Sequence, residues 1–594
     1  MKSVAMFPTI WRKWLAVVLA LLMAIALTGC NPAQFKTEAA QAPQVVVSNL
    51  GEPKTFNYAL NSESPNVFGY IYEGLVSENG LTGAIEPALA ESWKISEDNR
   101  QIMFTLREGL KWSDGEPLTA DDVAFTYNDI YFNEAIPTTI IDGLRIGESG
   151  SLPTVRKLDD RRVEFTTPEP FAPLLRNTGT AILPAHALRE SIISKDSEGK
   201  PRFLAIWGTD ADPTTIIVNG PYRIASYVSS ERVVFQRNPY YWRKDSQGNS
   251  MPYIERFIWQ IVESTDTALL QFRSRGLDAL GVSPATFSLL KREEKRGDFT
   301  IYNGGPAAGT TFIAFNLNKG QRNGRPLVDP IKSRWFNTVA FRKAVAHAID
   351  RQKMINNIFR GLGELQNSPI SVQSPYYLSP EEGLKVYDYN PEKSKQLLLG
   401  AGFKYNTQGQ LLDADGNRVR FTLITNTGGR SSDAMGSQIK QDLSKIGIQV
   451  DFNPVVFNTL LEKLNNTLDW ECYLLGFTGG IEPNDGANVW SPNGSSHRFN
   501  QLPEPGQPRL AGRVVSVWEE EIGRLYIQGA RELDEAKRKA IYAKTQQITQ
   551  EYLPFIYLVN PLAMTAVRDR IQGIKYSALG GAFWNMHELK IIDD

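Results

Sequence analysis

Four carboxylates stand close together in the stretch KWSDGEPLTADDVAFTY, residues 111–127: Asp114, Glu116, Asp121 and Asp122. Acids at this spacing can hold a divalent cation or act together as a general acid and base. The surrounding residues favour a structural role instead. Ser113-Asp114-Gly115 is typical of a turn, and Thr119 followed by Asp122 at the third position beyond it predicts a capping box. We therefore predict a turn and a helix start here, with Glu116 in solvent.

Common catalytic and nucleotide-binding motifs are missing from the sequence, including the P-loop, H-E-x-x-H and G-x-S-x-G. DADGN, residues 413–417, resembles the start of a calcium loop. Arg418 and Ile424 stand where such a loop needs its glycine and its bidentate glutamate, so we predict a hairpin turn around Asp415-Gly416. The four histidines are scattered singly. We expect no catalytic residue, no metal site and no cofactor.

Basic residues near the N-terminus precede an unbroken apolar run from Trp14 to Ala26. At ~1.5 Å per residue this run is shorter than the ~30 Å hydrocarbon core of a bilayer, which is typical of a secretory signal. The run leads into LTGC, which resembles the lipobox of bacterial lipoproteins; an ordinary signal peptide that ends near a cysteine is the alternative. We expect residues 1–29 to be a lipoprotein signal peptide, Cys30 the lipidation site and residues 30–43 a flexible spacer. The protein is then periplasmic or otherwise extracytoplasmic, and lipid-anchored to the cell membrane.

The rest of the sequence is that of a large globular protein. Its 594 residues exceed what one hydrophobic core usually holds, since a domain has ~150 residues. The 64 Lys and Arg nearly balance the 65 Asp and Glu, and no basic stripe points to nucleic acid. The second cysteine, Cys472, lies in the apolar string CYLLGF, so we expect it to be buried and the fold to have no internal disulfide.

Strand and helix patterns alternate along the chain. Residues Gln101 to Arg107 alternate apolar and polar side chains, as a half-buried strand does. Asn390 and Pro391 are typical of an N-cap and a first helical position, and Asp534 is placed to begin a helix that ends before Pro554. Such alternation over this length predicts large α/β lobes.

The stretch WSDGEPLTADDVAFTY also resembles the signature of the peptide/nickel-type (family 5) solute-binding proteins of ATP-driven importers. Further segments follow in the order that this family shows: YEGLV (72–76), EPALAESWKIS (86–96), NGPYRI (219–224), QRNPYYW (236–242), FRKAVAHAIDR (341–351) and YNPEKSKQLLLGAGF (389–403). These segments span most of the chain beyond the leader, so the sequence is identified as a member of this family.

The resemblance implies an α/β, bilobed fold of the periplasmic-binding-protein type II, with a hinge and one discontinuous lobe that carries an accessory subdomain. We expect lobe I to comprise residues 44–72, 190–305 and 560–594. The accessory subdomain is expected at residues 73–189 and lobe II at residues 306–559.

The resemblance also implies a function. We expect a monomeric receptor, not an enzyme, that binds an oligopeptide-like solute and delivers it to the permease subunits of an ABC importer. The alternatives are a receptor for a non-peptide solute, such as a sugar, a modified peptide or a metal chelate, and an exported enzyme.

Two segments match the ligand-contacting regions of the family. The expected contacts from both, with an aromatic residue upstream of the second, are Asn61, Ser62, Glu63, Phe457, Phe477, Thr478, Gly479, Gly480, Glu482 and Asp485. Phe457 and Phe477 fall where the family places aromatic pocket walls. The glycines from Gly476 to Gly480 are expected to let the main chain of a ligand approach closely.

One position departs from the peptide-binding relatives. They carry an aspartate where this sequence has Gly480, and that carboxylate pairs with the α-ammonium group of the peptide. A desolvated ammonium group without a counter-charge is costly. Either Glu482, Asp485 or Glu63 replaces the carboxylate, or the cargo has no free N-terminus at this point and the protein tolerates N-terminal blocking.

Overall fold

The computed structural model describes residues 43–61, 66–503 and 507–592. The predicted signal peptide, Cys30 and nearly all of the predicted spacer lie outside the described residues, as do Ser62 and Glu63. Within the described ranges, no helix combines the length and the apolar character that crossing a membrane requires.

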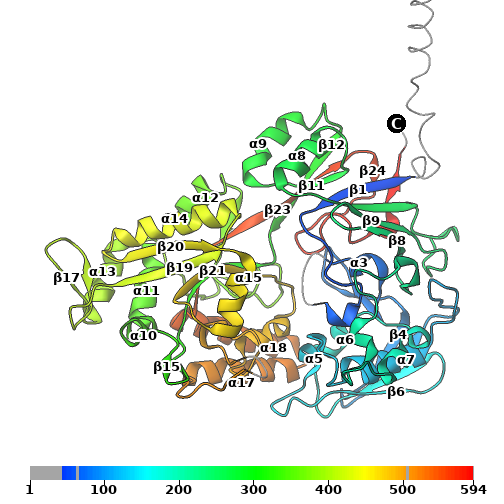
Figure 1. The fold of residues 1–594 in the computed structure, drawn as a ribbon, viewed down its shortest axis with the longest axis horizontal. Helices are drawn as coiled ribbons and strands as arrows, with labels where there is room; N and C mark the ends of the chain where they lie inside the picture. The colour runs from blue at the N-terminus through cyan, green and yellow to red at the C-terminus, as the bar shows by residue number, and fades with distance from the viewer. Residues whose placement is uncertain (1–42, 62–65, 504–506, 593–594) are drawn as a thin grey trace, which may run out of the picture.

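Two lobes stand side by side, each built on its own sheet (Figure 1). Lobe I has the strand order β12-β23-β11-β1-β10-β9-β8, with β16 added on β23, and β1 is parallel to both β10 and β11. Its strands are β1 (Gln44–Asn49), β8 (Tyr222–Val228), β9 (Arg232–Arg237), β10 (Arg256–Ile261), β11 (Ala279–Gly281), β12 (Phe299–Pro306), β16 (Gly363–Leu365) and β23 (Val559–Arg568). Its helices are α3 (Phe68–Ile71), α8 (Thr265–Arg273) and α9 (Pro284–Glu293).

Lobe II is built on a sheet with the order β20-β19-β21-β13-β22, in which β19 is parallel to both β20 and β21. These strands are β13 (Thr310–Phe315), β19 (Arg420–Asn426), β20 (Gln449–Val455), β21 (Cys472–Phe477) and β22 (Phe555–Tyr557). The helices are α10 (Pro330–Asn337), α11 (Val339–Ala348), α12 (Arg351–Asn357), α13 (Pro391–Gly400), α14 (Arg430–Ser444), α15 (Phe457–Leu461), α16 (Ala487–Trp490), α17 (Val517–Arg531) and α18 (Glu535–Tyr552). Predicted caps of two of these helices are confirmed, since Asn390 and Asp534 accept the hydrogen bonds of their N-cap positions.

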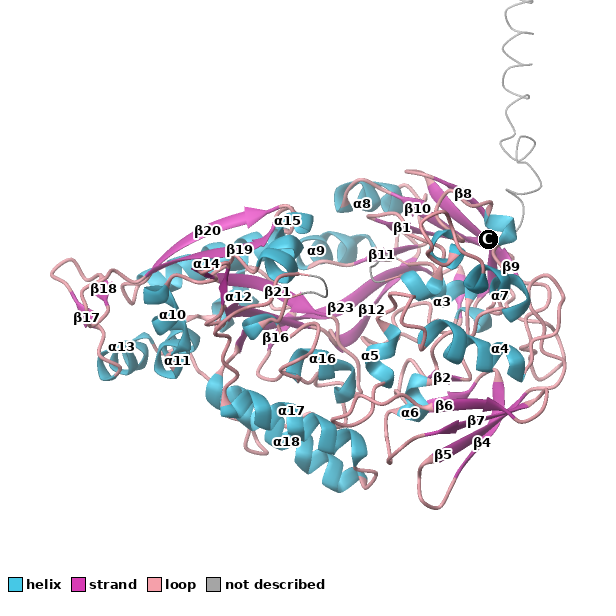
Figure 2. Ribbon diagram, turned by 60° about the horizontal axis from the view of Figure 1, so that its bottom comes forward, coloured by secondary structure: helices cyan, strands magenta, loops and turns pink. Residues whose placement is uncertain are grey.

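A third, smaller sheet lies below lobe I in Figure 2, with the antiparallel order β4-β5-β7-β6. Its elements are β4 (Ala90–Ile95), β5 (Gln101–Leu106), β6 (Thr154–Lys157), β7 (Arg162–Thr166), α4 (Ala120–Phe125), α5 (Ile140–Leu144), α6 (Leu174–Asn177) and α7 (Ala185–Ile193). Short strand pairs occur in both lobes and beside this sheet: β2 (Val76–Glu78) with β3 (Ile85–Pro87), β14 (Gln321–Arg322) with β15 (Arg325–Pro326), β17 (Lys404–Tyr405) with β18 (Leu411–Leu412), and β24 (Ile571–Gln572) with β25 (Lys590–Ile591).

Three of the four acids of residues 111–127 have structural roles and the fourth, Glu116, is in solvent, as predicted. Thr119 and Asp122 form the capping box of α4, and the other oxygen of Asp122 accepts from the backbone N–H of Ala185 at 2.9 Å. Asp114 pairs with His186 at 2.8 Å and Asp121 with Arg189 at 2.8 Å, while Glu116 is exposed. The acids therefore fix α4 against α7 and are not arranged as a catalytic pair.

The predicted hairpin turn around Asp415-Gly416 is confirmed, but its ladder is short. An antiparallel bridge joins Leu412 to Arg418, and the backbone N–H groups of Asp413 and Val419 donate to the carbonyl oxygens of Asn417 and Leu411, each at 2.9 Å. Beyond the turn, β18 pairs with β17, and β19 continues into a parallel pairing with β20. Because β19 lies in the interior of the lobe II sheet, its apolar side chains are buried there, and the sheet sets its pairing.

Two short connections join a strand of one lobe to a strand of the other, and β16, from the range expected for lobe II, also pairs with β23. β12 of lobe I ends at Pro306 and β13 of lobe II begins at Thr310, while β22 ends at Tyr557 and β23 begins at Val559. Figure 1 shows β23 running across the gap between the two bodies. Such short crossings can act as a hinge, because a few backbone dihedrals there change the relative orientation of two rigid bodies.

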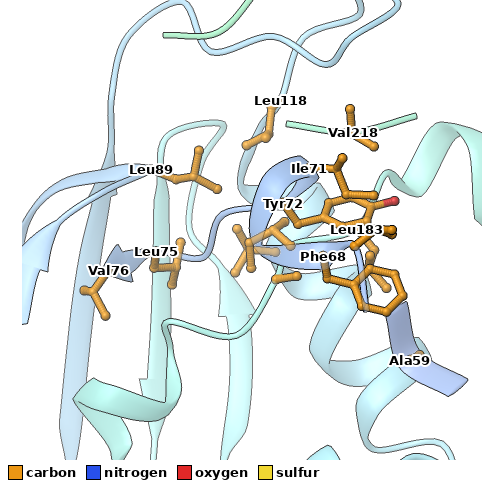
Figure 3. Close-up of a cluster of buried hydrophobic side chains, with 14 of the residues drawn as sticks. Ala59, Phe68, Ile71, Tyr72, Leu75, Val76, Leu89, Leu118, Leu183 and Val218 are labelled. Atoms are coloured by element: carbon orange, nitrogen blue, oxygen red, sulfur yellow. The ribbon is translucent and has the colours of Figure 1, made fainter. Parts of the chain in front are cut away.

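The apolar cores divide in the same way. One cluster joins lobe I to the small third sheet, and its side chains at the junction include Phe68, Ile71, Leu118, Leu183 and Val218 (Figure 3). A separate cluster fills lobe II and includes Phe312, Phe421 and Phe555. The small sheet and lobe I therefore share one core, whereas most of lobe II packs on a core of its own.

Candidate functional site

The carboxyl ends of β1 and β11 in lobe I and of β19 in lobe II face one cavity. In open α/β sheets, ligands bind in the crevice beyond these strand ends. In lobe II the loops after β19, β20 and β21 leave the same edge of the sheet, because the three strands run parallel. In lobe I the chain leaves β1 at Asn49 and β11 at Gly281, again from parallel neighbours.

The cavity between these edges has a volume of about 1380 Å³. Lobe I contributes residues at the ends of β1 and β11, including Asn49, Gly281 and Ser283, and lobe II contributes Gly429 and Arg430 at the start of α14. A second cavity of about 330 Å³ shares five of its lining residues, Ser48, Asn49, Trp259, Leu280 and Gly281, and so continues the first.

The lobes touch at the rim of this cavity. Arg430 of α14 forms an ion pair with Asp266 of α8 at 2.8 Å, and Arg360 donates to the carbonyl oxygen of Ala285 at 3.3 Å. Both side chains of the ion pair are largely exposed, so the pair contributes only about 0–1 kcal/mol. Contacts this weak permit the lobes to separate and admit a solute.

The loop after β21, residues 478–486, carries five of the ten site residues predicted from the sequence, and none of these five lines the cavity of about 1380 Å³. Glycines at the end of β21 and at the start of this loop pack against the protein's own chain. A Cβ on Gly476 would lie 2.3 Å from the carbonyl oxygen of Thr310, and one on Gly479 would lie 2.0 Å from that of Ala308. These glycines are therefore required by the close approach of β13 and the segment before it, whatever the cleft holds.

Glu482 is buried and already neutralised. Both of its carboxylate oxygens accept hydrogen bonds from Arg538 of α18, at 2.6 and 3.0 Å, and one also accepts from the backbone N–H of Asn484. Although burial opposes the charge of Arg538, Glu482 raises the pKa of that guanidinium above its ordinary value. This bidentate pair fixes the loop and leaves no free charge on Glu482 for a ligand.

Asp485 has the opposite character. A Cβ added to Gly480 would lie 3.2 Å from Oδ2 of Asp485, so this carboxylate occupies the space beside Gly480. The side chain is open to solvent, yet enough protein surrounds it that burial, with repulsion from Glu482, raises its pKa to about 7. Among the described residues, no cationic side chain forms an ion pair with Asp485.

The accessory side of the cleft closes over this loop. Arg176 pairs with Glu78 and also donates to the carbonyl oxygen of Gly83 at 3.0 Å. A Cβ on Gly83 would lie 2.2 Å from Cδ1 of Ile481, which shows that the two sides are in contact. Glu78 therefore has its own cation, and Asp485 is the acid of this cluster whose charge is unbalanced.

The other predicted residues lie in varied surroundings. Phe477 packs in the lobe II core, with ring centroids 5.0 Å from Phe312 and 5.8 Å from Phe555. Phe457 begins α15 and is 49% exposed, and Thr478 is exposed as well. Asn61 is half-buried and donates its backbone N–H to the carbonyl of Tyr58.

Sequence reasoning missed two features of the site. One is the set of residues at the start of α14, Gly428, Gly429 and Arg430, which line the cavity. Their signal was the glycine pair directly after an apolar strand, a typical loop position at the edge of a parallel sheet. The other is Arg538, which nothing local could identify, because it lies 56 residues from Glu482.

Comparisons with known proteins agree with this geometry. Residues 84–500 match the description "Bacterial extracellular solute-binding proteins, family 5 Middle". A probable ABC transporter-binding protein of Deinococcus radiodurans is 30% identical over 549 residues, covering 88% of each chain. The oligopeptide-binding protein AppA of Bacillus subtilis is 25% identical over 587 residues, covering 95% of this chain and 96% of AppA.

Solved structures share the fold. The periplasmic binding protein MelB of Agrobacterium fabrum, in complex with stachyose, superposes with a TM-score of 0.75 at 20% identity, covering 93% of this chain and 85% of MelB. The structure therefore has the bilobed binding-protein fold expected from the sequence. With a family match over most of its length, the chain belongs to the bacterial extracellular solute-binding proteins of family 5.

Proposed function

We propose that this protein is a lipid-anchored extracytoplasmic receptor that binds an oligopeptide-like solute between its lobes and delivers it to an ABC importer. The observation that carries the proposal is the cavity of about 1380 Å³ between the carboxyl ends of the parallel strands of both lobes. A solute held there contacts both lobes and so stabilises the closed form. The oligopeptide-binding relative supports a peptide as cargo.

Asp485 is the proposed anchor for the cargo's amine. It stands beside the position where peptide-binding relatives have their aspartate, and its charge is unbalanced in the empty protein. Glu482 is a poorer candidate because Arg538 already neutralises it. This arrangement favours a substitute carboxylate over a cargo without a free N-terminus.

The alternative within the same class is a non-peptide solute. MelB, which has the same fold, is described with a sugar. Thermal unfolding with a panel of peptides and uncharged solutes separates the two, because a bound cargo raises the unfolding temperature as its concentration exceeds Kd. Stabilisation by no member of the panel contradicts the receptor proposal, and turnover of a cargo favours an enzyme.

The domain division and the anchor are proposed on the same basis. We take residues 44–72, 190–305 and 560–594 as lobe I, 73–189 as its accessory subdomain and 306–559 as lobe II. Cys30→Ser is expected to yield a folded protein that no longer sediments with membranes, because LTGC is the proposed site of lipidation. A variant that still sediments with membranes after a salt wash contradicts the lipid anchor.

A further inference from the structure

A separate cavity of about 710 Å³ lies between the accessory side and lobe II. Residues 142–150 and Phe171 line one wall, and parts of residues 484–503 and of α17 line the other. It shares no lining residue with the two cavities between the strand ends. Figure 2 shows α5 and α6 facing α16 and α17 across this region. Like the main cleft, this cavity is bounded by both moving bodies.

Its position ties it to the candidate site. Asn484 and Ala487 line this cavity, and Asp485 stands between them in the sequence. The turn Pro483–Gly486 is therefore a wall common to the cavity and to the anchor region. Beside it, the backbone N–H of Ala172 donates to the carbonyl oxygen of Ala530 at 2.7 Å, which closes the cavity when the lobes meet.

The lining offers uncharged hydrogen-bonding groups. Four of its polar residues are amides, Asn484, Asn488, Asn493 and Gln501, and three are serines, Ser149, Ser491 and Ser495. Gln501 is 3% exposed and donates its amide N–H to the carbonyl oxygen of Ser495 at 3.1 Å, while its own Oε1 has no donor among the described residues. A buried acceptor without a donor is unfavourable, so a hydroxyl or N–H that reached it would be stabilised.

The charges of the cavity are already paired or lie at its rim. Arg145 pairs with Asp142 at 3.8 Å and Arg524 pairs with Glu521. Two further carboxylates of the lining, Glu148 and Glu520, form no ion pair among the described residues and are exposed at the rim. Neither guanidinium is left free to hold an anion. Two buried aromatic residues, Phe171 and Tyr526, add apolar surface to the lining. Amides beside aromatic surface suit a group that is hydroxylated at its edges and apolar on its faces.

We propose that this cavity is a second ligand subsite, for an uncharged polyhydroxylated group of the size of a mono- or disaccharide. Such a group comes either as a free sugar or as a sugar carried on the amine of a peptide cargo. In the second case the proposal rests on the proposed function, because the peptide then occupies the main cleft. In both cases the group contacts the two lobes together and favours closure.

Calorimetry with the full chain tests the proposal. Maltose is the uncharged probe, and glucuronate is its anionic counterpart. Saturable binding of maltose is expected. Glucuronate should bind about tenfold or more weakly, since both guanidinium groups of the lining are paired and its carboxylates repel an anion. Ile527→Trp fills the cavity from α17 and should abolish maltose binding. Leu533→Trp adds the same side chain at an exposed position outside it and should leave binding unchanged.

A peptide arm distinguishes the two sources of the group. Trialanine coupled to glucose by reductive amination keeps a charged secondary amine for Asp485 and carries a polyol beyond it. If cargo brings the sugar, this probe binds more tightly than trialanine, and Ile527→Trp removes only that gain. A free sugar gives maltose binding without such a gain. Trialanine carries no sugar and therefore tests only binding in the main cleft. If trialanine does not bind, that result contradicts the proposed function and not the sugar subsite.

Two results overturn the proposal. One is that neither maltose nor the coupled peptide shows a saturable contribution from the sugar in the wild type. The other is sugar binding that survives Ile527→Trp but is lost in Gly281→Trp, which fills the main cleft where a Cβ on Gly281 meets open space. The sugar then lies in the main cleft. Gln501→Leu gives a second measurement of the subsite, since it removes the free acceptor and should weaken maltose binding.

Discussion

Replacing Asp485 with asparagine should weaken binding of an amine-bearing cargo by about 10- to 150-fold. A hydrogen bond to a charged group contributes about 1.5–3 kcal/mol, and about 1.4 kcal/mol corresponds to a factor of ten in Kd. This range is below that of a fully desolvated charge pair, because the Asp485 carboxylate is open to solvent in the empty cleft. The asparagine keeps the shape of the side chain and removes its charge.

Calorimetry of trialanine and N-acetyl-trialanine, against wild type and Asp485→Asn, measures the pair directly. Acetylation removes the ammonium charge, so it should weaken binding to the wild type by a similar factor and have little further effect on the variant. The double variant Gly480→Asp with Asp485→Ala moves the carboxylate to position 480, where the removal of Asp485 leaves room for it. This variant should recover discrimination against the acetylated peptide.

The affinity should also depend on pH. Burial, with repulsion from Glu482, raises the pKa of Asp485 to about 7, so the carboxylate is protonated below that value and ionised above it. A cationic cargo binds the ionised form, so affinity should fall by roughly tenfold between pH 7 and pH 5.5 in the wild type. Asp485→Asn should show no such fall.

Equal binding of free and acetylated peptide by the wild type would refute the reasoning. It would mean that Asp485 holds no cargo amine and that the protein accepts blocked peptides. A loss on acetylation that Asp485→Asn leaves intact would place the counter-charge elsewhere. Glu482→Gln would then be the next variant, with Arg538 left as an unpaired buried cation.

Three further outcomes are expected. Because the pKa of Asp485 is raised to about 7 in the folded protein, ionising this carboxyl lowers the stability of the fold as the pH rises from the unfolded value of ~3.9 through 7. Asp485→Asn should therefore raise the unfolding temperature at pH 8 but hardly at pH 4, while exposed Asp469→Asn should do neither. Arg538→Leu should lower the free energy of unfolding, measured by denaturant titration, by about 3–5 kcal/mol, because it leaves Glu482 buried without a cation. As a control, Arg420→Leu breaks an exposed pair and should lower it by about 0–1 kcal/mol. Small-angle scattering should give a smaller radius of gyration with cargo bound, and an unchanged radius with a confirmed cargo would contradict closure about the crossing segments.

Local sequence signals predicted the parts of the fold that depend on neighbouring residues. The capping box of Thr119 and Asp122 and the caps at Asn390 and Asp534 are local, because each donor and acceptor lies within one helical turn. The turn at Asp415-Gly416 shows the limit of such signals. Its residues favour a hairpin, but the strand that follows is drawn into a parallel sheet by contacts with β20 and β21, which come later in the chain.

The site was less predictable because its electrostatics depend on long-range contacts. Resemblance to relatives placed the loop of residues 478–486 in the cleft, but could not rank Glu482 against Asp485. That ranking depends on Arg538, brought from α18. The glycines from Gly476 to Gly480 were expected to let the main chain of a ligand approach, whereas the chain that approaches Gly476 is the protein's own, at Thr310. The antiparallel pairing of β13 with β21 brings Thr310 next to Gly476, and no short sequence pattern predicts a pairing of strands so far apart in the chain.

The charges around the loop explain why a cation fits this end of the cleft. Glu482 is paired with Arg538 from within lobe II, and Glu78 is paired with Arg176 on the accessory side. With Asp485 ionised, the cluster then holds one more negative charge than positive, and that charge is on the side chain that is open to solvent. A single ammonium group restores neutrality, whereas a neutral or anionic group leaves the imbalance in place or increases it. Without cargo, the ionised Asp485 carboxylate is unfavourable here. A bound ammonium group stabilises this charge, and the energy gained adds to the affinity for a positively charged cargo.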